Sequence, residues 1–143
     1  MELKEAIKSV ILAPIEGEKD RMIGIELEDF VYDLKGKRIP VNPCSEYSAS
    51  DLLNNLIDFQ ENDKNKAYYS IEPGGQIEWA STPQRSLHDL QIELNNHQNR
   101  LNRLFTNYQL ETIDLAVEPI YLPSEIDFID QKKYKLLHKL FKR

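Results

Sequence analysis

Apolar residues alternate with glycine and glutamate along residues 23–28, as in a strand that buries one face, within a longer β-prone stretch at residues 21–34. The stretch is rich in β-branched and aromatic residues and contains no proline, which also favours a strand. Its apolar side carries Ile23, Ile25 and Leu27, and its other side carries Gly24, Glu26 and Glu28. Two carboxylates therefore share a face, beside a glycine that leaves room above the sheet.

A second predicted strand lies within residues 68–83, where three polar groups interrupt an apolar, β-prone run. Gln76 and Glu78 have the same parity and should project together, while the residues between and after them face a core. Glu72 shares that parity, but the Pro-Gly-Gly sequence at residues 73–75 permits a bulge. The direction of the Glu72 side chain stays open at this point.

Helical spacing of apolar residues predicts four helices. The first ends before Pro14, and Ser50 is expected to cap the second. The long third helix would cover the sheet with a stripe of leucines, and the Lys-rich fourth would present a solvated face. The helices are expected at residues 2–12, 51–60, 85–107 and 130–141. A turn at residues 33–38 and short strands at 39–41 and 112–121 complete the prediction.

This order of elements predicts an α+β fold, in which helices pack on one face of a largely antiparallel sheet. A chain of 143 residues, 41% hydrophobic and 29% charged, suits one globular domain with a modest core. We therefore expect residues 1–143 to form a single domain. An open sheet of this size would leave its acidic face to solvent unless more chain or a partner covers it.

Charge and hydropathy narrow the choice of partners. The formal net charge of −6 argues against a nucleic acid partner, because binding to a phosphate backbone depends on clustered lysine and arginine. The first residues alternate in charge, where a leader would need a basic end and an apolar block. No apolar run approaches the roughly 20 residues of a membrane span. We therefore expect a cytoplasmic chain with no membrane partner.

Cysteine, histidine and glycine patterns give little support for other chemistry. Cys44 is the single cysteine, which excludes an internal disulfide, and its neighbours include no positive group to activate a nucleophile. His88, His97 and His138 lack the spacing of a zinc site. His88 and Asn95 are expected to bind the loop before the third helix from one helix face. The sequence contains neither a P-loop nor a Gly-x-Gly-x-x-Gly element.

The paired acids have two interpretations from the residues alone. A solvated strand face commonly carries alternating carboxylates and needs no function. A cation site is the alternative, because both predicted strands place acidic or amide groups beside a glycine and their oxygens could meet around one ion. Mg²⁺ or Mn²⁺ would suit carboxylate ligands, and such an ion would in turn suit the phosphate oxygens of ATP.

Four segments carry a family resemblance. They are Gly-Ile-Glu-Leu-Glu at residues 24–28, Glu-Pro-Gly-Gly-Gln-Ile-Glu at 72–78, Leu-His at 87–88 and Glu-Leu-Asn-Asn-His at 93–97. With these motifs the chain resembles the glutamate-cysteine ligases of the plant and proteobacterial type, from about Arg21 to the last predicted helix. The Glu-Pro-Gly-Gly-Gln-x-Glu element is highly specific. Such a ligase is considerably longer, so the resemblance covers only its N-terminal part.

The resemblance implies an ATP-dependent carboxylate-amine ligase with a glutamine-synthetase-like catalytic sheet. In that family the γ-carboxylate of glutamate takes a phosphoryl group from ATP, and the amine of cysteine displaces phosphate to give γ-glutamylcysteine, the first step towards glutathione. Acidic residues of the sheet hold magnesium ions during this transfer. The resemblance implies that Glu26, Glu28, Glu72 and Glu78 are metal ligands and that Gln76 lies near substrate glutamate. It assigns no catalytic residue.

The chain also departs from the family pattern. It shows no cluster of arginines to bind the α-carboxylate of glutamate and the ATP phosphates, and Glu118 stands where the family tends to have an amide. The basic groups would lie in a C-terminal portion, so we expect a fragment, a truncated product or one part of a split enzyme. Such a piece would self-associate through exposed apolar surface. A non-catalytic binding or assembly module on the same fold, and a related ligase with another amine substrate, stay open as alternatives.

Overall fold

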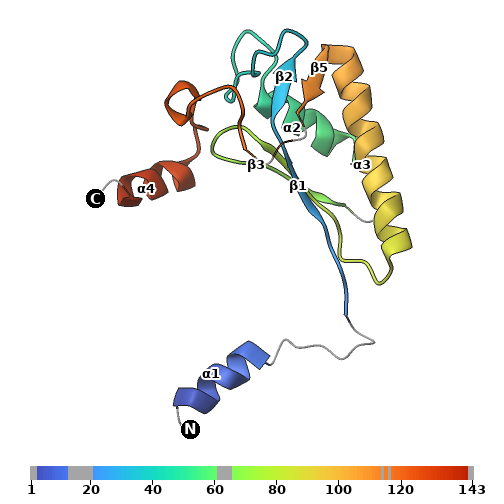
Figure 1. Ribbon diagram of the computed structural model, residues 1–143, viewed down its shortest axis with the longest axis vertical. Helices are drawn as coiled ribbons and strands as arrows, with labels where there is room; N and C mark the ends of the chain where they lie inside the picture. The colour runs from blue at the N-terminus through green and yellow to red at the C-terminus, as the bar shows by residue number, and fades with distance from the viewer. Residues whose placement is uncertain (1–2, 13–20, 61–65, 114, 116, 142–143) are drawn as a thin grey trace.

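The computed structural model describes residues 3–12, 21–60, 66–113, 115 and 117–141 (Figure 1). Over these ranges the elements form an α+β fold, as predicted. The helices are α1 (Leu3–Leu12), α2 (Ala49–Asp58), α3 (Leu87–Tyr108), the 3₁₀ helix η1 (Pro123–Glu125) and α4 (Lys132–Phe141). The strands are β1 (Glu26–Asp29), β2 (Val31–Asp33), β3 (Tyr68–Ile71), β4 (Ile77–Ala80) and β5 (Leu110–Thr112).

The described strands form two small antiparallel sheets instead of one larger sheet. β4 lies between β1 and β3 in the first sheet, and β2 pairs with β5 in the second. The strand predicted over residues 21–34 is therefore interrupted at Phe30, where the chain passes from one sheet to the other. Phe30 is buried, and Cζ of Arg38 lies 5.0 Å from the centroid of its ring. This cation–π contact adds to the burial of Phe30 at the crossing point.

The turn predicted at residues 33–38 is present, but the strand predicted after it is not. The Asp33 carboxylate accepts hydrogen bonds of 2.9 Å from two backbone N–H groups within the turn. The return strand expected at residues 39–41 is reduced to an isolated bridge between Tyr32 and Arg38. β2 pairs with β5 on its other side, so this hairpin stays short.

The predicted cap of α2 is wrong by two residues. Ser48 Oγ accepts a hydrogen bond from Asp51 N at 3.2 Å, and the Asp51 carboxylate accepts one from Ser48 N at 2.9 Å. This reciprocal capping box sets the start of the helix. Ser50 lies inside the first turn, where its hydroxyl donates to the Val41 carbonyl at 2.9 Å.

β5 covers only Leu110–Thr112, so the strand predicted over residues 112–121 is wrong for most of the part that the structure describes. Glu118 turns back and accepts hydrogen bonds from the backbone N–H groups of Ile120 at 2.9 Å and Tyr121 at 3.1 Å. A carboxylate that binds the amides following it closes a local turn, which competes with strand pairing.

Helices α2 and α3 cover one face of the three-stranded sheet, as predicted, and the core lies between them. Ile77 and Trp79 of β4 are each 1% exposed and join Leu52 and Leu56 of α2 and Leu101 of α3 in this core. Trp79 is therefore a core residue. Figure 1 shows α3 running alongside both sheets, with α4 away from it at the other end of the fold. The face of β4 that α2 and α3 leave uncovered carries Glu78.

Both terminal helices of the described chain keep apolar side chains exposed. These include Leu3 and Val10 of α1 and Leu136 and Phe141 of α4. The predicted self-association stays a prediction. Within the described ranges, no helix combines the length and the apolar character needed to cross a membrane.

Candidate functional site

The register of β1 and β4 brings two of the predicted carboxylates face to face. Glu28 lies directly opposite Glu78. Residues opposite each other in an antiparallel pair project to the same face, so both carboxylates leave the sheet on the side away from α2 and α3. Glu26 lies two residues before Glu28 and so on the same face, opposite Ala80. Glu26 and Glu28 are both exposed.

Glu72 joins this face from the turn after β3. Its N–H donates to the Gln76 carbonyl at 2.9 Å, and its carbonyl accepts from Gly75 N at 2.8 Å, which closes the turn. Burial raises the pKa of the Glu72 carboxyl above its usual value, and the negative charges of Glu78 and Glu28 raise it further. The Glu72 carboxyl therefore lies close enough to Glu78 and Glu28 for their negative charges to act on it.

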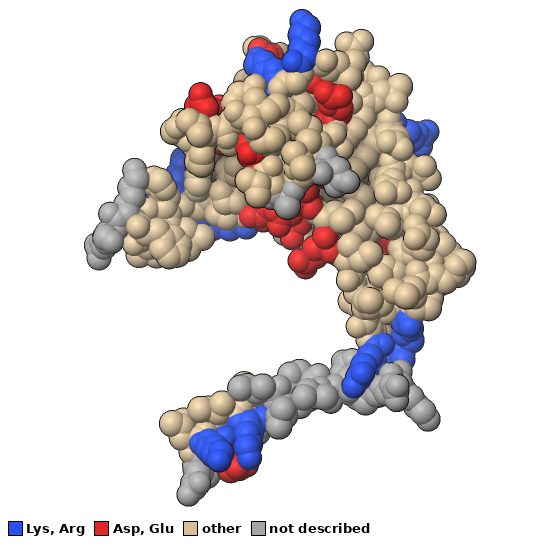
Figure 2. Space-filling model, viewed as in Figure 1, with Lys and Arg blue, Asp and Glu red and all other residues tan. Residues whose placement is uncertain are grey.

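Two further side chains, which sequence analysis did not single out, border the acidic face. Ser70 of β3 lies opposite Glu78, and its hydroxyl donates a hydrogen bond to that carboxylate. The positive charge of Lys133 in α4 acts against the rise in the pKa of Glu72. Figure 2 shows acidic side chains grouped over the middle of the three-stranded sheet, with basic side chains between them and α4. The lysines of α4 are exposed, as predicted, and no local pattern shows that the segment before this helix bonds back to the turn after β3, where Ile129 N donates to the Pro73 carbonyl at 2.9 Å.

Gln76 is turned inward at the end of the same turn. Its Oε1 atom is buried and has no hydrogen-bond partner among the residues that the structure describes. A Cβ at Gly74 would lie 2.9 Å from this oxygen, so glycine at that position makes room for the amide. A buried acceptor without a partner is unfavourable unless water or a ligand supplies a donor.

The carboxylate oxygens of the acidic face are suitable ligands for Mg²⁺ or Mn²⁺, but they are not already grouped around one point. In the described part of the chain, no three His, Cys, Asp or Glu side chains are grouped so that they could hold a metal ion. Both ions prefer carboxylate oxygens, and a cation would relieve the repulsion that raises the pKa of Glu72. The residues therefore fit such an ion, and the fold gathers Glu28, Glu72 and Glu78, with Glu26 next along β1. The ligand assignment itself stays a prediction.

His97 lies on the buried side of β4, beneath these carboxylates. Its ring stacks on Trp79 with centroids 4.5 Å apart and an interplanar angle of 7°, and its Nδ1 lies 3.0 Å from the Tyr69 hydroxyl. Burial, together with the positive charge of Arg100, lowers the pKa of His97 to about 4. The imidazole is therefore uncharged at neutral pH and serves the packing of α3 on the sheet.

The interpretation of His88 and Asn95 is wrong, because another residue of α3 binds the preceding loop. Both side chains are exposed, and Asn95 accepts a hydrogen bond from within its own helix. Glu93 instead accepts hydrogen bonds from Thr82 N at 2.8 Å, Thr82 Oγ1 at 2.9 Å and Gln84 Nε2 at 3.0 Å. A carboxylate can accept several bonds at once, so it satisfies this loop better than an amide or imidazole.

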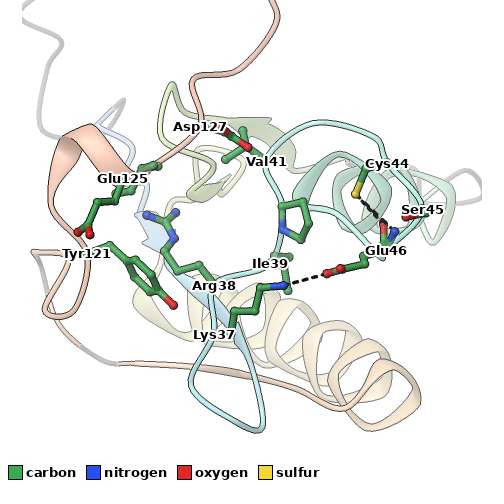
Figure 3. Close-up of a pocket in the computed structure, with 12 residues that line it drawn as sticks. Lys37, Arg38, Ile39, Val41, Cys44, Ser45, Glu46, Tyr121, Glu125 and Asp127 are labelled. Carbon is green, nitrogen blue, oxygen red and sulfur yellow. Dashed lines mark hydrogen bonds and ion pairs between the residues drawn. The ribbon is translucent and has the colours of Figure 1, made fainter.

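A hollow of about 450 Å³ lies between residues 37–46 and 121–127 (Figure 3). Lys37 and Arg38 line it, but Lys37 Nζ pairs with Glu46 at 3.2 Å and Arg38 pairs with Glu118 at 3.0 Å. The exposed Cys44 thiol also lines the hollow, where its Sγ accepts from Glu46 N at 3.4 Å. Because both lining cations already pair with carboxylates of the chain, this hollow is poorly suited to an anionic ligand.

The described residues form an α+β fold, and carboxylates gather on one face of its three-stranded antiparallel sheet. The model of the glutamate-cysteine ligase family 2 (GCS2) matches residues 22–143, from just before β1 to the end of the chain. The chain belongs to this family. The predicted resemblance is therefore confirmed.

Similar proteins include plant enzymes. Chloroplastic glutamate--cysteine ligase B of Oryza sativa subsp. japonica is 23% identical over 146 residues, which cover 94% of this chain and 29% of that protein. Chloroplastic glutamate--cysteine ligase of Medicago truncatula is 25% identical over 129 residues, which cover 82% of this chain and 25% of that protein. The chain thus spans less than a third of the length of these relatives.

Proposed function

We propose that this chain supplies the acidic strands of an ATP-dependent glutamate-cysteine ligase with a glutamine-synthetase-like catalytic sheet. The observation that carries the proposal is the pairing of Glu28 with Glu78 across β1 and β4, with the Glu72 carboxyl beside them. Like charges directly opposite in a sheet are unfavourable, so their grouping calls for a cation or a cationic substrate. Membership of the ligase family supports the choice of reaction.

In this proposal Glu26, Glu28, Glu72 and Glu78 would hold Mg²⁺ or Mn²⁺. Such an ion, when bound, neutralises charge on the ATP phosphates during phosphoryl transfer. The hydroxyl of Ser70 orients the Glu78 carboxylate through its hydrogen bond.

Gln76 and Lys133 would act on the substrates. The half-buried Gln76 would lie near substrate glutamate, as the resemblance to the family implies. Lys133 supplies positive charge beside Glu72 for an anionic group of the substrates. The reaction joins the γ-carboxylate of glutamate to the amine of cysteine through γ-glutamyl phosphate.

The test is magnesium-dependent phosphate release by the full-length protein with ATP, glutamate and cysteine. Because even residues that only support a metal ligand are worth about 10–100-fold in metal affinity or activity, Glu72→Gln and Glu78→Gln should each lower the rate by about 100-fold or more. Glu111→Gln is the matched control, since this exposed glutamate lies on β5 in the other sheet, and it should retain the normal rate. Unchanged rates in both site variants would refute the proposal.

The same assay separates the alternatives. Turnover with another amine, but not with cysteine, would identify a related carboxylate-amine ligase. Binding of ATP and Mg²⁺ measured by calorimetry, without phosphate release under any condition, would leave a ligase with an unidentified substrate. Absence of both binding and turnover would favour a non-catalytic module built on this fold.

A further inference from the structure

Arg38 joins parts of the chain that are far apart in the sequence. Its Nη1 donates to Glu118 Oε2 at 3.0 Å, and its Nη2 donates to the Gly74 carbonyl at 2.5 Å. The side chains of Arg38 and Glu118 are each only 9% exposed. A guanidinium presents its donors in a fixed planar fork, so one side chain can hold both acceptors in a defined relation.

Glu118 gives Arg38 a fixed anchor. Glu118 Oε2 also accepts from the Tyr32 hydroxyl at 2.8 Å, and its Oε1 accepts from the backbone N–H groups of Ile120 and Tyr121. Burial alone would raise the pKa of Glu118, but these hydrogen bonds and the charge of Arg38 outweigh it and lower the pKa below its usual value. The carboxylate is therefore charged and immobilised, and it orients the guanidinium towards Gly74. Figure 3 shows that guanidinium turned away from Lys37 and Glu46.

The other end of this connection is the turn that carries Glu72 and Gln76. Gly75 has a φ of 84°, a left-handed conformation that favours glycine, and a Cβ there would lie 2.7 Å from Val41. The turn is thus packed closely against the segment that follows Arg38. The Arg38 bond to the Gly74 carbonyl fixes the peptide between the two functional side chains.

We propose that Arg38 is a positioning residue for the acidic face: by binding the Gly74 carbonyl, it holds the turn so that Glu72 stays beside Glu28 and Glu78. This inference rests on the proposed function, because it concerns the same carboxylates. Arg38 touches neither substrate nor metal in this role. It acts through the turn.

Amide hydrogen exchange of the metal-free, full-length protein tests the structural half of this inference. The N–H groups of Glu72 and Gly75 make the two hydrogen bonds that close the turn, so they report its opening. Arg38→Gln should speed exchange at these two amides by about tenfold or more relative to the rest of β3 and β4. Arg38→Lys keeps the positive charge but loses the planar guanidinium that reaches two acceptors, and it should increase the exchange rate at the same amides by less.

Tyr32→Phe is the matched control. It removes the Tyr32 hydrogen bond to Glu118, from the same buried network, without touching Gly74. Its thermal unfolding temperature should fall while exchange at Glu72 and Gly75 stays normal. If Tyr32→Phe and Arg38→Lys speed exchange equally throughout β3 and β4, Arg38 is only a stabilising residue and the inference is wrong. Arg38→Lys decides the question even if Arg38→Gln does not fold.

The functional half is tested with Mn²⁺ as the probe, by titration of the full-length protein. Arg38→Gln should raise the dissociation constant by about tenfold, as expected for a residue that supports a ligand, and Arg38→Lys should raise it by less. Glu72→Gln should raise it further. If Glu72→Gln leaves Mn²⁺ binding unchanged, the proposed function fails. If Glu72→Gln weakens binding but both Arg38 variants bind normally, the positioning role alone fails.

Discussion

Two groups of carboxylates lie on either side of the turn at residues 72–76: the acidic face, made up of Glu26, Glu28, Glu72 and Glu78, and the Arg38 network, in which Arg38 binds Glu118. The carboxylates of the two groups have opposite electrostatic surroundings. Glu118 pairs with Arg38, and further hydrogen bonds hold its pKa below the usual value. Glu72 is partly buried near Glu78 and Glu28, and its pKa is raised by that burial and then by their negative charges. Both are carboxylates removed in part from water, yet only Glu118 has its charge fully compensated within the described chain.

This difference separates a carboxylate that stabilises the fold from one that we propose as a metal ligand. A compensated charge stabilises the fold and has little capacity left for a ligand. Carboxylates crowded together weaken the fold slightly and are stabilised when a cation binds, which is typical of functional sites. Sequence alone ranked Glu118 as a departure from the family, whereas the structure makes it a support of the turn that carries Glu72.

The largest expected change in the free energy of unfolding is for Glu118, whose charge Arg38 compensates. Glu118→Ala leaves Arg38 buried without its carboxylate, and loss of one partner of a buried ion pair costs about 3–5 kcal/mol of unfolding free energy. Urea denaturation followed by circular dichroism measures this value. The exposed Glu111→Ala should change it by no more than about 0.5 kcal/mol. Equal effects of the two variants would contradict the stabilising role of the Arg38–Glu118 ion pair.

The next effect concerns His97, a titratable group that burial keeps uncharged. Its pKa of about 4 lies below the 6.5 of an unperturbed histidine, so between these values the unfolded state binds the extra proton. The contribution of His97 is therefore complete above pH 6.5 and is lost as pH falls towards 4, by about 3 kcal/mol in total.

Urea denaturation between pH 7 and pH 4 tests this dependence by difference. His97→Phe should remove that part of the loss of stability on acidification. The same substitution at the exposed His88 should leave the pH dependence as it is in the unaltered chain. A His97→Phe variant with an unchanged pH dependence would show that burial does not keep this imidazole neutral.

The smallest expected change in stability is for Glu72, which lies near other carboxylates, and here the substitution should stabilise the protein. The raised pKa of Glu72 means that its favourable contribution is present below the ordinary value of 4.5 and is lost as pH rises through the higher folded pKa. Glu72→Gln should therefore stabilise the metal-free protein at pH 7 by up to about 1 kcal/mol, and by less at pH 4. Thermal unfolding at the two pH values measures it, and destabilisation at pH 7 would contradict the repulsion.

The features that depend on local pattern were predictable from the sequence. Alternation placed Glu26 and Glu28 on one face, helical spacing located α3, and the family motif identified the turn at residues 72–76. Parity gives the face of a strand but not its partner, so the pairing of Glu28 with Glu78 depended on the structure.

Other features depend on contacts between distant segments. At the break between β1 and β2, Arg38 lies over the ring of Phe30, and the turn at Glu118 includes hydrogen bonds that no periodicity encodes. The charge of Lys133 acts on Glu72 although the two residues are 61 positions apart, and Ile129, just before α4, bonds to Pro73 beside Glu72. Sequence patterns describe each element separately and do not show which residues of distant segments come into contact.

The order of the strands also affects when the acidic face can assemble. Glu78 bonds to Ser70 within a hairpin, across eight positions of the chain, whereas Ile25 beside β1 bonds to Ser81 across 56 positions. Because loop closure over the longer distance is less favourable, the hairpin can form early and β1 docks later. The proposed cation site, which requires Glu28 as well as Glu78, would therefore be complete only after β1 has docked on β4.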